Sequence, residues 1–410
     1  MARWLFALLL LSPQAQETIA EIRVHGNVAT PDDEVRRLAG IEIGAPVTAD
    51  TVAIVADRLR STKRFQRVDV LKRFASIDDL SRIVLVIVVD EGPVNIERTA
   101  DPDRPVRVVK KRGPNLMFLP LLSAEDGYGL IYGGQIGIPN PAGRDSRLSF
   151  PLTWGGDKRA AAEFEKDYDA GRTRLIGTAA INRRTHPYFD RDEDRGRLTA
   201  RIEREIAHAV RIGATSGWQH VSFLDATDSF FHAGADVVVD TRLDPVLAYN
   251  AVYARASWEH LDFRSGGSNN RSELEGRGYI GLVGQTVLVV RGLRDDASDP
   301  LPVYLEPMLG GLANLRGFKA GTTIGDTLVA TSAELRVPLT SPLKVGKIGV
   351  SAFVDAGVAY SKSERLADQT WKKGIGGGFW ASAAIVRFNV AVAHGIGAGT
   401  RVHIGGTVSF

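Results

Sequence analysis

An arginine and an aspartate are the residues of this chain whose types and setting best support a specific polar contact. Arg316 lies in the glycine-containing segment Leu315–Phe318, which is typical of a loop, and Asp355 lies farther along in Phe353–Gly357. A guanidinium carries five donors in a planar arrangement that matches a carboxylate. A loop that brings Arg316 to Asp355 would therefore be held by an ion pair.

The segments around these two residues alternate between apolar and polar side chains. Residues 327–339 place Val329, Leu335 and Val337 on one side, and residues 347–358 place Asp355 on the polar side. Side chains alternate between the two faces of a strand. A polar face opposite a continuous apolar one indicates an aqueous lumen inside a lipid-facing wall. Asp355 therefore belongs to a predicted lumen.

The same pattern recurs from residue 116 to residue 410, in short runs separated by glycine, asparagine and aspartate. Charged residues occupy one face of these runs, as Glu273, Glu275 and Arg277 do opposite Leu274. Such a row is costly in a dry core but not in a wet lumen. The fold class predicted is mainly β, a transmembrane antiparallel β-barrel of about sixteen strands.

Residues 17–93 have a different pattern, typical of one small α/β domain. The predicted order is strand, helix, helix, strand, strand (β-α-α-β-β), with the first helix capped by Thr30 and the second over residues 49–65. The last two strands are expected over 66–74 and 82–90. About 75 residues suffice for one small core.

The two ends of the chain and the segment between the domains carry further signals. Residues 1–16 have a basic start, an apolar core and small residues near Ala15, which predicts a cleaved secretory signal peptide. An uncleaved anchor is the alternative, but the apolar stretch is short for a bilayer. Residues 94–115 show no period and are expected to be a linker. The last predicted strand, Arg401 to Phe410, ends on an aromatic residue, which fits a sorting signal better than a soluble edge strand.

Composition narrows the function classes. The chain has no cysteine and a net charge of +3, and no basic block with interleaved aromatics argues for nucleic acid. No motif of a serine hydrolase, zinc protease or P-loop is present, so neither an enzyme nor a cofactor or metal site is expected. Four histidines expected in the lumen or loops show no ligand spacing: His208, His220, His260 and His403.

Taken together, the segments resemble the BamA/TamA-like outer-membrane assembly factors of the bacterial surface antigen family, as a short member with one POTRA domain. Leu315-Arg316-Gly317-Phe318 matches the family motif [VL]-R-G-[FY], and Phe353-Val354-Asp355-Ala356-Gly357 matches F-x-D-x-G. The resemblance covers nearly the whole mature chain. It implies that the loop folds back into the barrel, docks Arg316 on Asp355 and offers Glu334 as a second acceptor. Gly317, Phe318 and Gly357 complete the implied loop anchor.

The resemblance also implies a lateral gate between the first and last strands, here the strands near Tyr128 to Ile138 and from Arg401 to Phe410. Gly405 and Gly406 lie within the last strand. Glycine there either loosens strand pairing or makes room beneath a bulky neighbour, and the sequence leaves both readings open. Phe410 is the implied sorting signal.

The implied function is that of an outer-membrane insertase or translocase of a Gram-negative-type bacterium, with the N-terminal domain in the periplasm. Implied partners are unfolded outer-membrane or secreted client polypeptides, outer-membrane lipids, and periplasmic chaperones or accessory lipoproteins. A POTRA domain would receive clients by adding a strand to a sheet edge. The alternatives are a passive pore, a two-partner secretion transporter for one adhesin, and a lipid-acting barrel enzyme, which the missing nucleophile and base disfavour.

Overall fold

The computed structural model describes residues 16–27, 30–76, 79–91, 94–97, 107–110, 116–242, 248–340, 347–382 and 386–408. The chain divides into an N-terminal unit, Met1–Lys110, and a C-terminal unit, Lys111–Phe410. Residues 1–15 of the predicted signal peptide and Phe410 lie outside the described residues.

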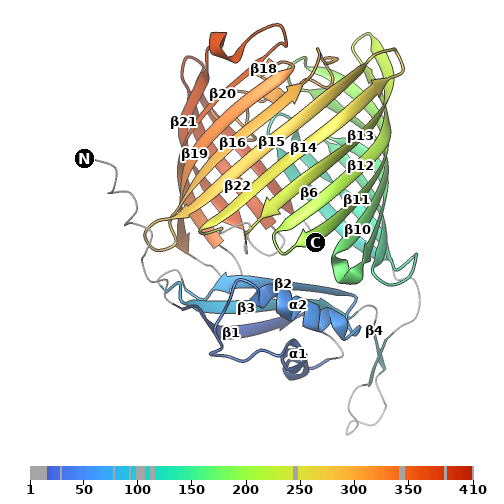
Figure 1. Cartoon of the computed structure of the whole chain (residues 1–410), viewed down its shortest axis with the longest axis vertical. Coiled ribbons are helices and arrows are strands. Elements are labelled where there is room, and N and C mark those ends of the chain that lie inside the picture. The colour runs from blue at the N-terminus through green and yellow to red at the C-terminus, as the bar shows by residue number, and fades with distance from the viewer. Residues whose placement is uncertain are drawn as a thin grey trace. The chain divides into compact units, whose positions relative to one another are not determined.

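The N-terminal unit is a small α/β domain with the predicted order of elements. It comprises β1 (Thr18–His25), α1 (Asp32–Ala39), α2 (Thr51–Ser61), β2 (Arg67–Phe74) and β3 (Arg82–Asp90). The sheet order is β1-β3-β2, with β1 parallel and β2 antiparallel to the central strand. β1 and β2 are therefore its edge strands (Figure 1).

Both helices pack one apolar stripe onto the sheet, and the buried side chains of all five elements form a single core. Val35 and Leu59, one from each helix, are fully buried against Ile83, Leu85 and Ile87 of β3. α1 ends where Gly40 adopts φ 64°, a left-handed conformation that glycine takes without a steric penalty.

The predicted cap of the first helix is wrong by one residue. Pro31, not Thr30, occupies the N-cap, and its extended ψ of 150° starts the helix at Asp32. The Thr30 backbone N–H instead donates to the buried Glu91 carboxylate at 2.8 Å. Thr30, which the local pattern predicted to cap the helix, is thus engaged in a tertiary contact with Glu91.

The segment predicted to be a linker contains two short strands. β4 (Val94–Glu97) pairs antiparallel with β5 (Arg107–Lys110). Four residues are too few to produce a visible period in the sequence, which explains why these strands were not expected.

No helix among the described residues is long and apolar enough to cross a membrane.

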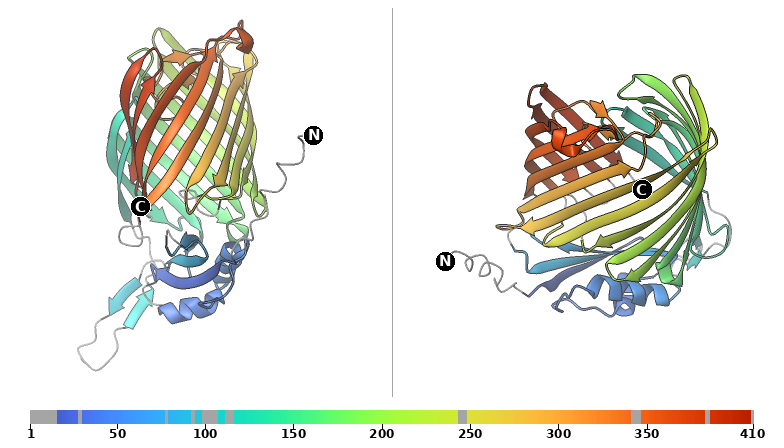
Figure 2. Two further views of the ribbon diagram at one scale, coloured as in Figure 1. Left: turned by 90° about the vertical axis from the view of Figure 1, so that its left-hand side faces the viewer. Right: turned by 45° about the horizontal axis from the view of Figure 1, so that its top comes forward.

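The C-terminal unit is a closed antiparallel barrel of sixteen strands, as predicted (Figures 1 and 2). In chain order these are β6 (Met117–Glu125), β7 (Gly129–Pro139), β8 (Ser146–Gly155), β9 (Lys158–Tyr168), β10 (Thr173–His186), β11 (Arg191–Ala207), β12 (Val210–Phe223), β13 (Ala226–Asp240), β14 (Ala251–Phe263), β15 (Ser268–Gly281), β16 (Val287–Ala297), β19 (Thr327–Thr340), β20 (Lys347–Tyr360), β21 (Lys372–Ser382), β22 (Val386–Gly395) and β23 (Gly399–Val408). Two short 3-10 turns, η1 (Asp169–Gly171) and η3 (Leu366–Asp368), lie in connections.

The alternation read from the sequence separates the two faces of the wall. Large apolar side chains point outward and are well exposed, for example Ile181, Phe231 and Val402 at 67%, 64% and 62%. Charged and small residues of the same strands face the lumen. Because lipid cannot hydrogen-bond the backbone, closure of the sheet into a barrel satisfies the strands within the membrane.

The first strand of the barrel lies earlier than predicted. It is β6, whereas the strand expected near Tyr128 to Ile138 is β7, the second. Residues 117–122 read Met-Phe-Leu-Pro-Leu-Leu, an apolar run without alternation that hides its strand character. Proline within it suits a strand at a seam, where one edge need not donate hydrogen bonds.

One long connection, residues 298–326, joins β16 to β19 and carries the short strand pair β17 (Met308–Leu309) and β18 (Thr323–Ile324). We call it the lumen loop, and the end of the barrel from which it departs the loop end. β6 begins and β23 ends at the opposite end, because the strands alternate in direction.

Candidate functional site

The lumen loop lies inside the barrel, because residues along its length bind inward-facing groups of the wall. The Arg195 guanidinium of β11 donates to the Tyr304 carbonyl oxygen at 2.9 Å, and Arg291 of β16 donates to the Ala313 carbonyl oxygen. Leu301 and Tyr304 pack on a buried aromatic cluster of the wall that includes Phe223 and Phe230. The loop is thus attached to the lumen side of several strands.

Arg316 is the most densely bonded residue of the loop, and it meets the predicted aspartate. Its Nε and one Nη donate to the two oxygens of Asp355, each at 2.8 Å. The other Nη donates to Glu334 Oε2 at 2.5 Å, and the Arg316 backbone N–H also donates to Asp355, at 2.9 Å. Arg316 thus binds both carboxylates that the resemblance implied.

Further groups complete this buried cluster. Ser332 donates to Asp355 at 2.7 Å and accepts a bond from Arg316 at 3.1 Å. The guanidinium carbon of Arg316 lies 3.3 Å from the ring centre of Phe353, within the range of a cation–π contact. Arg316, Asp355 and Glu334 are 7%, 4% and 7% exposed, so the ions are shielded from bulk water.

Charge is balanced within the cluster. Glu334 is shared by Arg316 and by Arg336, which donates to it at 2.7 Å. Two guanidiniums therefore face two carboxylates. Removal of one partner from such a buried set leaves an uncompensated charge, which costs about 3–5 kcal/mol.

Glycine residues of the wall lie directly under the loop. A side chain at Gly374 would strike the Arg316 carbonyl, one at Gly395 would strike Gly317, and one at Gly357 would strike Leu309. Gly317 itself has φ of 92°, and its Cα approaches the backbone at Gly395. Phe318, 5% exposed, packs in the cluster with Leu309 and Leu315. The predicted residues Gly317, Phe318 and Gly357 thus lie at the loop–wall contact.

The two glycines of the last strand have different neighbours. Gly405 faces the lumen, where a side chain would collide with Leu312 of the loop, so it makes room beneath a bulky neighbour. Gly406 is one of three residues of β23 that pair with β6, opposite Ala124. By contrast, β22 and β23 pair at ten positions and β6 and β7 at nine. Among the described residues the seam between the first and last strands is therefore short.

Two contributors to the site had no role assigned from the sequence: His403 was named only as a lumen or loop histidine, and Asp126 was not named. His403 of β23 is 2% exposed, and its Nε2 accepts a hydrogen bond from the Gly317 backbone N–H at 2.8 Å. Its Nδ1 lies 2.6 Å from Asp126 Oδ2, and that oxygen also accepts from the Leu312 N–H at 2.8 Å. The only signal available for His403 was its place on the polar face of the last strand, and for Asp126 there was none.

The surroundings of Asp126 lower the pKa of its carboxyl group. Burial acts to raise the pKa of the carboxyl, but the hydrogen bonds from His403 and Leu312 outweigh it and hold the pKa below its usual range. Asp126 therefore stays ionised and remains an acceptor.

Two other histidines named from the sequence, His220 and His260, each bond one polar side chain of the next strand. His220 bonds Ser229 at 2.8 Å and His260 bonds Asn270 at 3.0 Å, each beside a stacked tryptophan of its own strand. In the part of the chain that the structure describes, no three histidine, aspartate or glutamate side chains gather in a way that could hold a metal ion.

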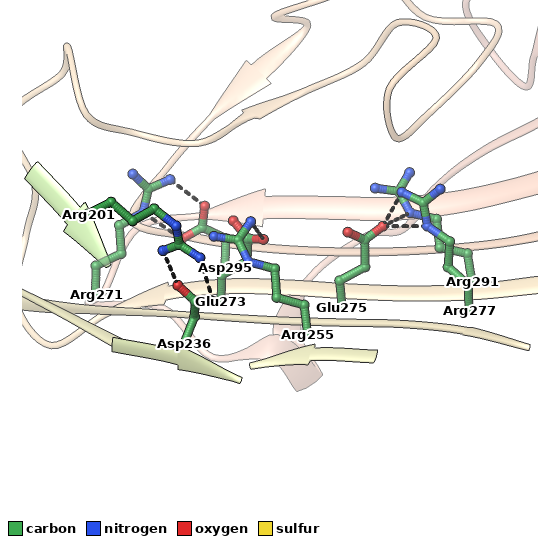
Figure 3. A network of polar contacts seen from close by, with 9 residues as sticks. All are labelled: Arg201, Asp236, Arg255, Arg271, Glu273, Glu275, Arg277, Arg291 and Asp295. Carbon is green, nitrogen blue, oxygen red and sulfur yellow. Dashed lines mark hydrogen bonds and ion pairs between the residues drawn. The ribbon is translucent and has the colours of Figure 1, made fainter. Parts of the chain in front are cut away.

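The opposite wall of the lumen, β11 to β16, carries a ladder of arginine–carboxylate pairs (Figure 3). Arg201 binds Asp236 at 2.5 and 3.1 Å, and Arg271 binds Asp295 through Nε at 2.8 Å. Glu275 accepts bonds from both Arg277, at 2.6 Å, and Arg291, at 2.7 Å. A looser pair joins Arg255 and Glu273 at 3.4 Å. The five arginines and four carboxylates of Figure 3 nearly cancel in charge.

Comparison with known protein families assigns this architecture. A model described as the Omp85 superfamily domain matches residues 140–404, and a model described as POTRA, surface antigen variable number repeat, matches residues 17–92. The chain belongs to the Omp85 superfamily. It is a BamA/TamA-like member with one POTRA domain, as the sequence motifs predicted, and its sixteen-stranded barrel makes it an outer-membrane protein.

Solved structures share this Omp85 fold at low sequence identity. The crystal structure of BamA from Haemophilus ducreyi lacking POTRA domains 1-3 matches at 15% identity and a TM-score of 0.62, over 96% of this chain and 84% of that chain. CdiB from Escherichia coli matches at 14% identity and 0.54, over 98% of this chain and 92% of that chain. CdiB from Acinetobacter baumannii matches at 12% identity and 0.52, over 97% of this chain and 74% of that chain. No curated protein matches the sequence.

Proposed function

We propose that this Omp85 protein is a non-enzymatic insertase or translocase. It would assemble β-barrel proteins into the outer membrane, or secrete polypeptides across it, with the N-terminal domain in the periplasm. The observation that carries the proposal is the lumen loop, docked through Arg316 on Asp355 and Glu334 at 2.5–2.9 Å. A loop held by so many buried bonds is a defined element with a docked state, which a passive opening does not require.

The domain plan supports the same proposal. We assign residues 1–16 to a signal peptide, 17–93 to a periplasmic arm, 94–115 to a linker and 116–410 to the barrel. Edge strands β1 and β2 of the arm offer backbone groups to which an extended client could add. Proposed partners are unfolded client polypeptides, outer-membrane lipids, and periplasmic chaperones or accessory lipoproteins.

Depletion of the protein from its cells tests the proposal. We expect one or more outer-membrane or secreted proteins to fall in abundance, and re-expression of the wild-type chain to restore them. Re-expression of Arg316→Ala should fail to do so, whereas Arg183→Ala, which breaks an arginine–aspartate pair between two half-exposed side chains, should succeed. Normal levels of every other outer-membrane and secreted protein after depletion would contradict the proposal.

Conductance separates a translocase from a passive pore. In planar bilayers we expect Arg316→Ala to change the size and frequency of openings, because it frees the loop from the wall. A steady conductance that is the same in wild type and Arg316→Ala would instead favour the passive pore.

A further inference from the structure

The described residues of β23 pair with β6 only near the C-terminal end of the strand. The backbone pairs are Gly406–Ala124, Thr407–Ser123 and Val408–Leu122. β23 continues toward the loop end to Gly399, beyond the last residue of β6, Glu125. Within the described residues, this stretch of the last strand has no backbone pairing with the first strand.

Side chains bridge this gap, and they do so through the lumen loop. Asp126 follows β6 directly, and His403 lies three residues beyond the last backbone pair. The two side chains are bonded at 2.6 Å. The loop binds each of them separately, through Leu312 N–H to Asp126 and Gly317 N–H to His403, both at 2.8 Å.

The hydrogen-bond pattern assigns the proton of the histidine. Because Nε2 accepts from the Gly317 N–H, the proton of a neutral ring sits on Nδ1 and is donated to Asp126. The three bonds close a triangle whose corners are the last strand, the turn after the first strand and the loop. Loss of any one side leaves a polar group of the other two without its partner in a largely buried setting.

We propose that Asp126 and His403 form a clasp that couples the lumen loop to the seam. While the loop is docked, its Leu312 and Gly317 amides hold Asp126 and His403 together across the unpaired part of the seam. When the loop leaves the wall, the clasp loses two of its three bonds, so loop release and seam opening become one event. The inference rests on the proposed function and names positioning residues for it.

The geometry makes the coupling reciprocal. Gly317 follows Arg316 in the chain. His403 of the clasp and Asp355 of the wall therefore bind adjacent residues of the loop. A client that parts the strands breaks the Asp126–His403 bond and weakens the hold on Gly317. Any coupling free energy acts equally in both directions.

The test uses the full chain in planar bilayers without client, so its result is independent of the assembly assay for the proposed function. The chain has no cysteine, so a Ser123→Cys/Thr407→Cys pair across the seam supplies its only thiols. We expect Asp126→Ala and His403→Ala each to raise the frequency of large openings about tenfold or more. The double variant should add little to either, because all three remove the same bridge. Oxidation of the cysteine pair should abolish the increase.

Matched variants separate the clasp from a general loss of packing. Asp126→Asn keeps an oxygen for the His403 and Leu312 donors and should behave close to wild type. His394→Ala should change nothing, because that histidine is exposed on neighbouring strand β22 and bonds only Thr400 among the contacts described. Wild-type opening in both alanine variants would overturn the clasp, as would an increase that persists after the seam is cross-linked. If an alanine variant does not fold, the double variant Asp126→Lys/His403→Glu, which can form a new ion pair at this place, is compared with Asp126→Lys alone. Fewer openings in the double variant support the clasp, and equal opening in the two would overturn it.

Discussion

The wall formed by β11 to β16 and the wall formed by β19 to β23 share the alternation of outward apolar and lumen-facing polar residues. They differ in the size of the side chains that face the lumen. The first carries Arg201, Arg271 and their neighbours, whose long side chains bind carboxylates of the same wall. The second carries Gly357, Gly374 and Gly395, and the backbone of the lumen loop lies against them. The first wall reaches the loop through long side chains such as Arg195 and Arg291, whereas the glycines of the second wall let the loop backbone approach the strands themselves.

Charge alone does not distinguish the wall on which Arg316 docks from the opposite wall. Both walls contain arginine–carboxylate pairs, but Arg316 reaches its partners from a different element, 39 residues away from Asp355 in sequence. The ladder pairs all lie within one sheet, either on one strand, on neighbouring strands or, for Arg201 and Asp236, on strands separated by one other. A pair that links two elements can control their separation, and a pair within one sheet can only stiffen it.

The largest effect is expected from Asp355→Ala, which removes the bidentate partner of a buried arginine. Docking of the loop should weaken by about 3–5 kcal/mol, because Arg316 keeps one carboxylate of two and its backbone N–H loses its acceptor. Limited proteolysis within residues 298–326 of the reconstituted barrel measures this release. Protection equal to wild type would show that packing against the glycines alone holds the loop.

A smaller effect is expected from Gly374→Val, which adds a side chain under the loop and leaves every charge in place. The new side chain would meet the Arg316 carbonyl, and overpacking of this kind costs about 1–3 kcal/mol. The control is Gly292→Ala on β16, where a methyl group meets open space. If both variants protect the loop as well as wild type does, shape complementarity of the wall does not matter.

The ladder should respond differently. Arg271→Ala leaves Asp295, which is 6% exposed, without its charged partner and is expected to destabilise the barrel by about 1–3 kcal/mol. The midpoint of thermal unfolding should fall, while proteolysis of the lumen loop at 25 °C should stay as in wild type. Faster cleavage of the loop would mean that the ladder also controls docking of the loop, contrary to the difference between the two walls.

The smallest effect is expected from Arg183→Ala. Arg183 binds Asp194 through two bonds of 2.6 Å, the same bidentate geometry as at Arg316, but both side chains are about half exposed, at 53% and 48%. Solvent screens such a pair. The unfolding midpoint and loop protection should both match wild type, and a clear loss of either would show that bidentate geometry outweighs burial.

The periodic parts of the fold were predictable because alternation is local. Strand β3 was predicted over the residues it occupies, 82–90, and the barrel with sixteen strands was predicted from alternation and turn residues. The first barrel strand was misplaced because Met117 to Leu122 are all apolar or proline. The N-cap of α1 was misplaced because a distant residue, Glu91, binds the Thr30 amide.

The candidate site was predictable only where a family motif names the residues. Arg316, Glu334 and Asp355 came from two motifs and the strand between them. His403 and Asp126 are 277 residues apart, and no pattern along the chain relates a turn after the first strand to the last strand. Gly405 had two possible roles until the position of Leu312 was known.

The amino-acid sequence alone sufficed to predict one small α/β domain, a β-barrel and a loop arginine with an aspartate partner. The strands and helices depend on residue type and on spacing within about ten positions, since their faces are set locally. The pairing of Arg316 with Asp355 spans 39 residues and rests on the alternation of the segments around it and on the family motifs. The tertiary structure was needed to show where the barrel closes and which glycines lie under the loop. It was also needed to show that Asp126 and His403 meet at the seam. Ring closure brings the first and last strands together, and the contacts made there depend on every strand between them.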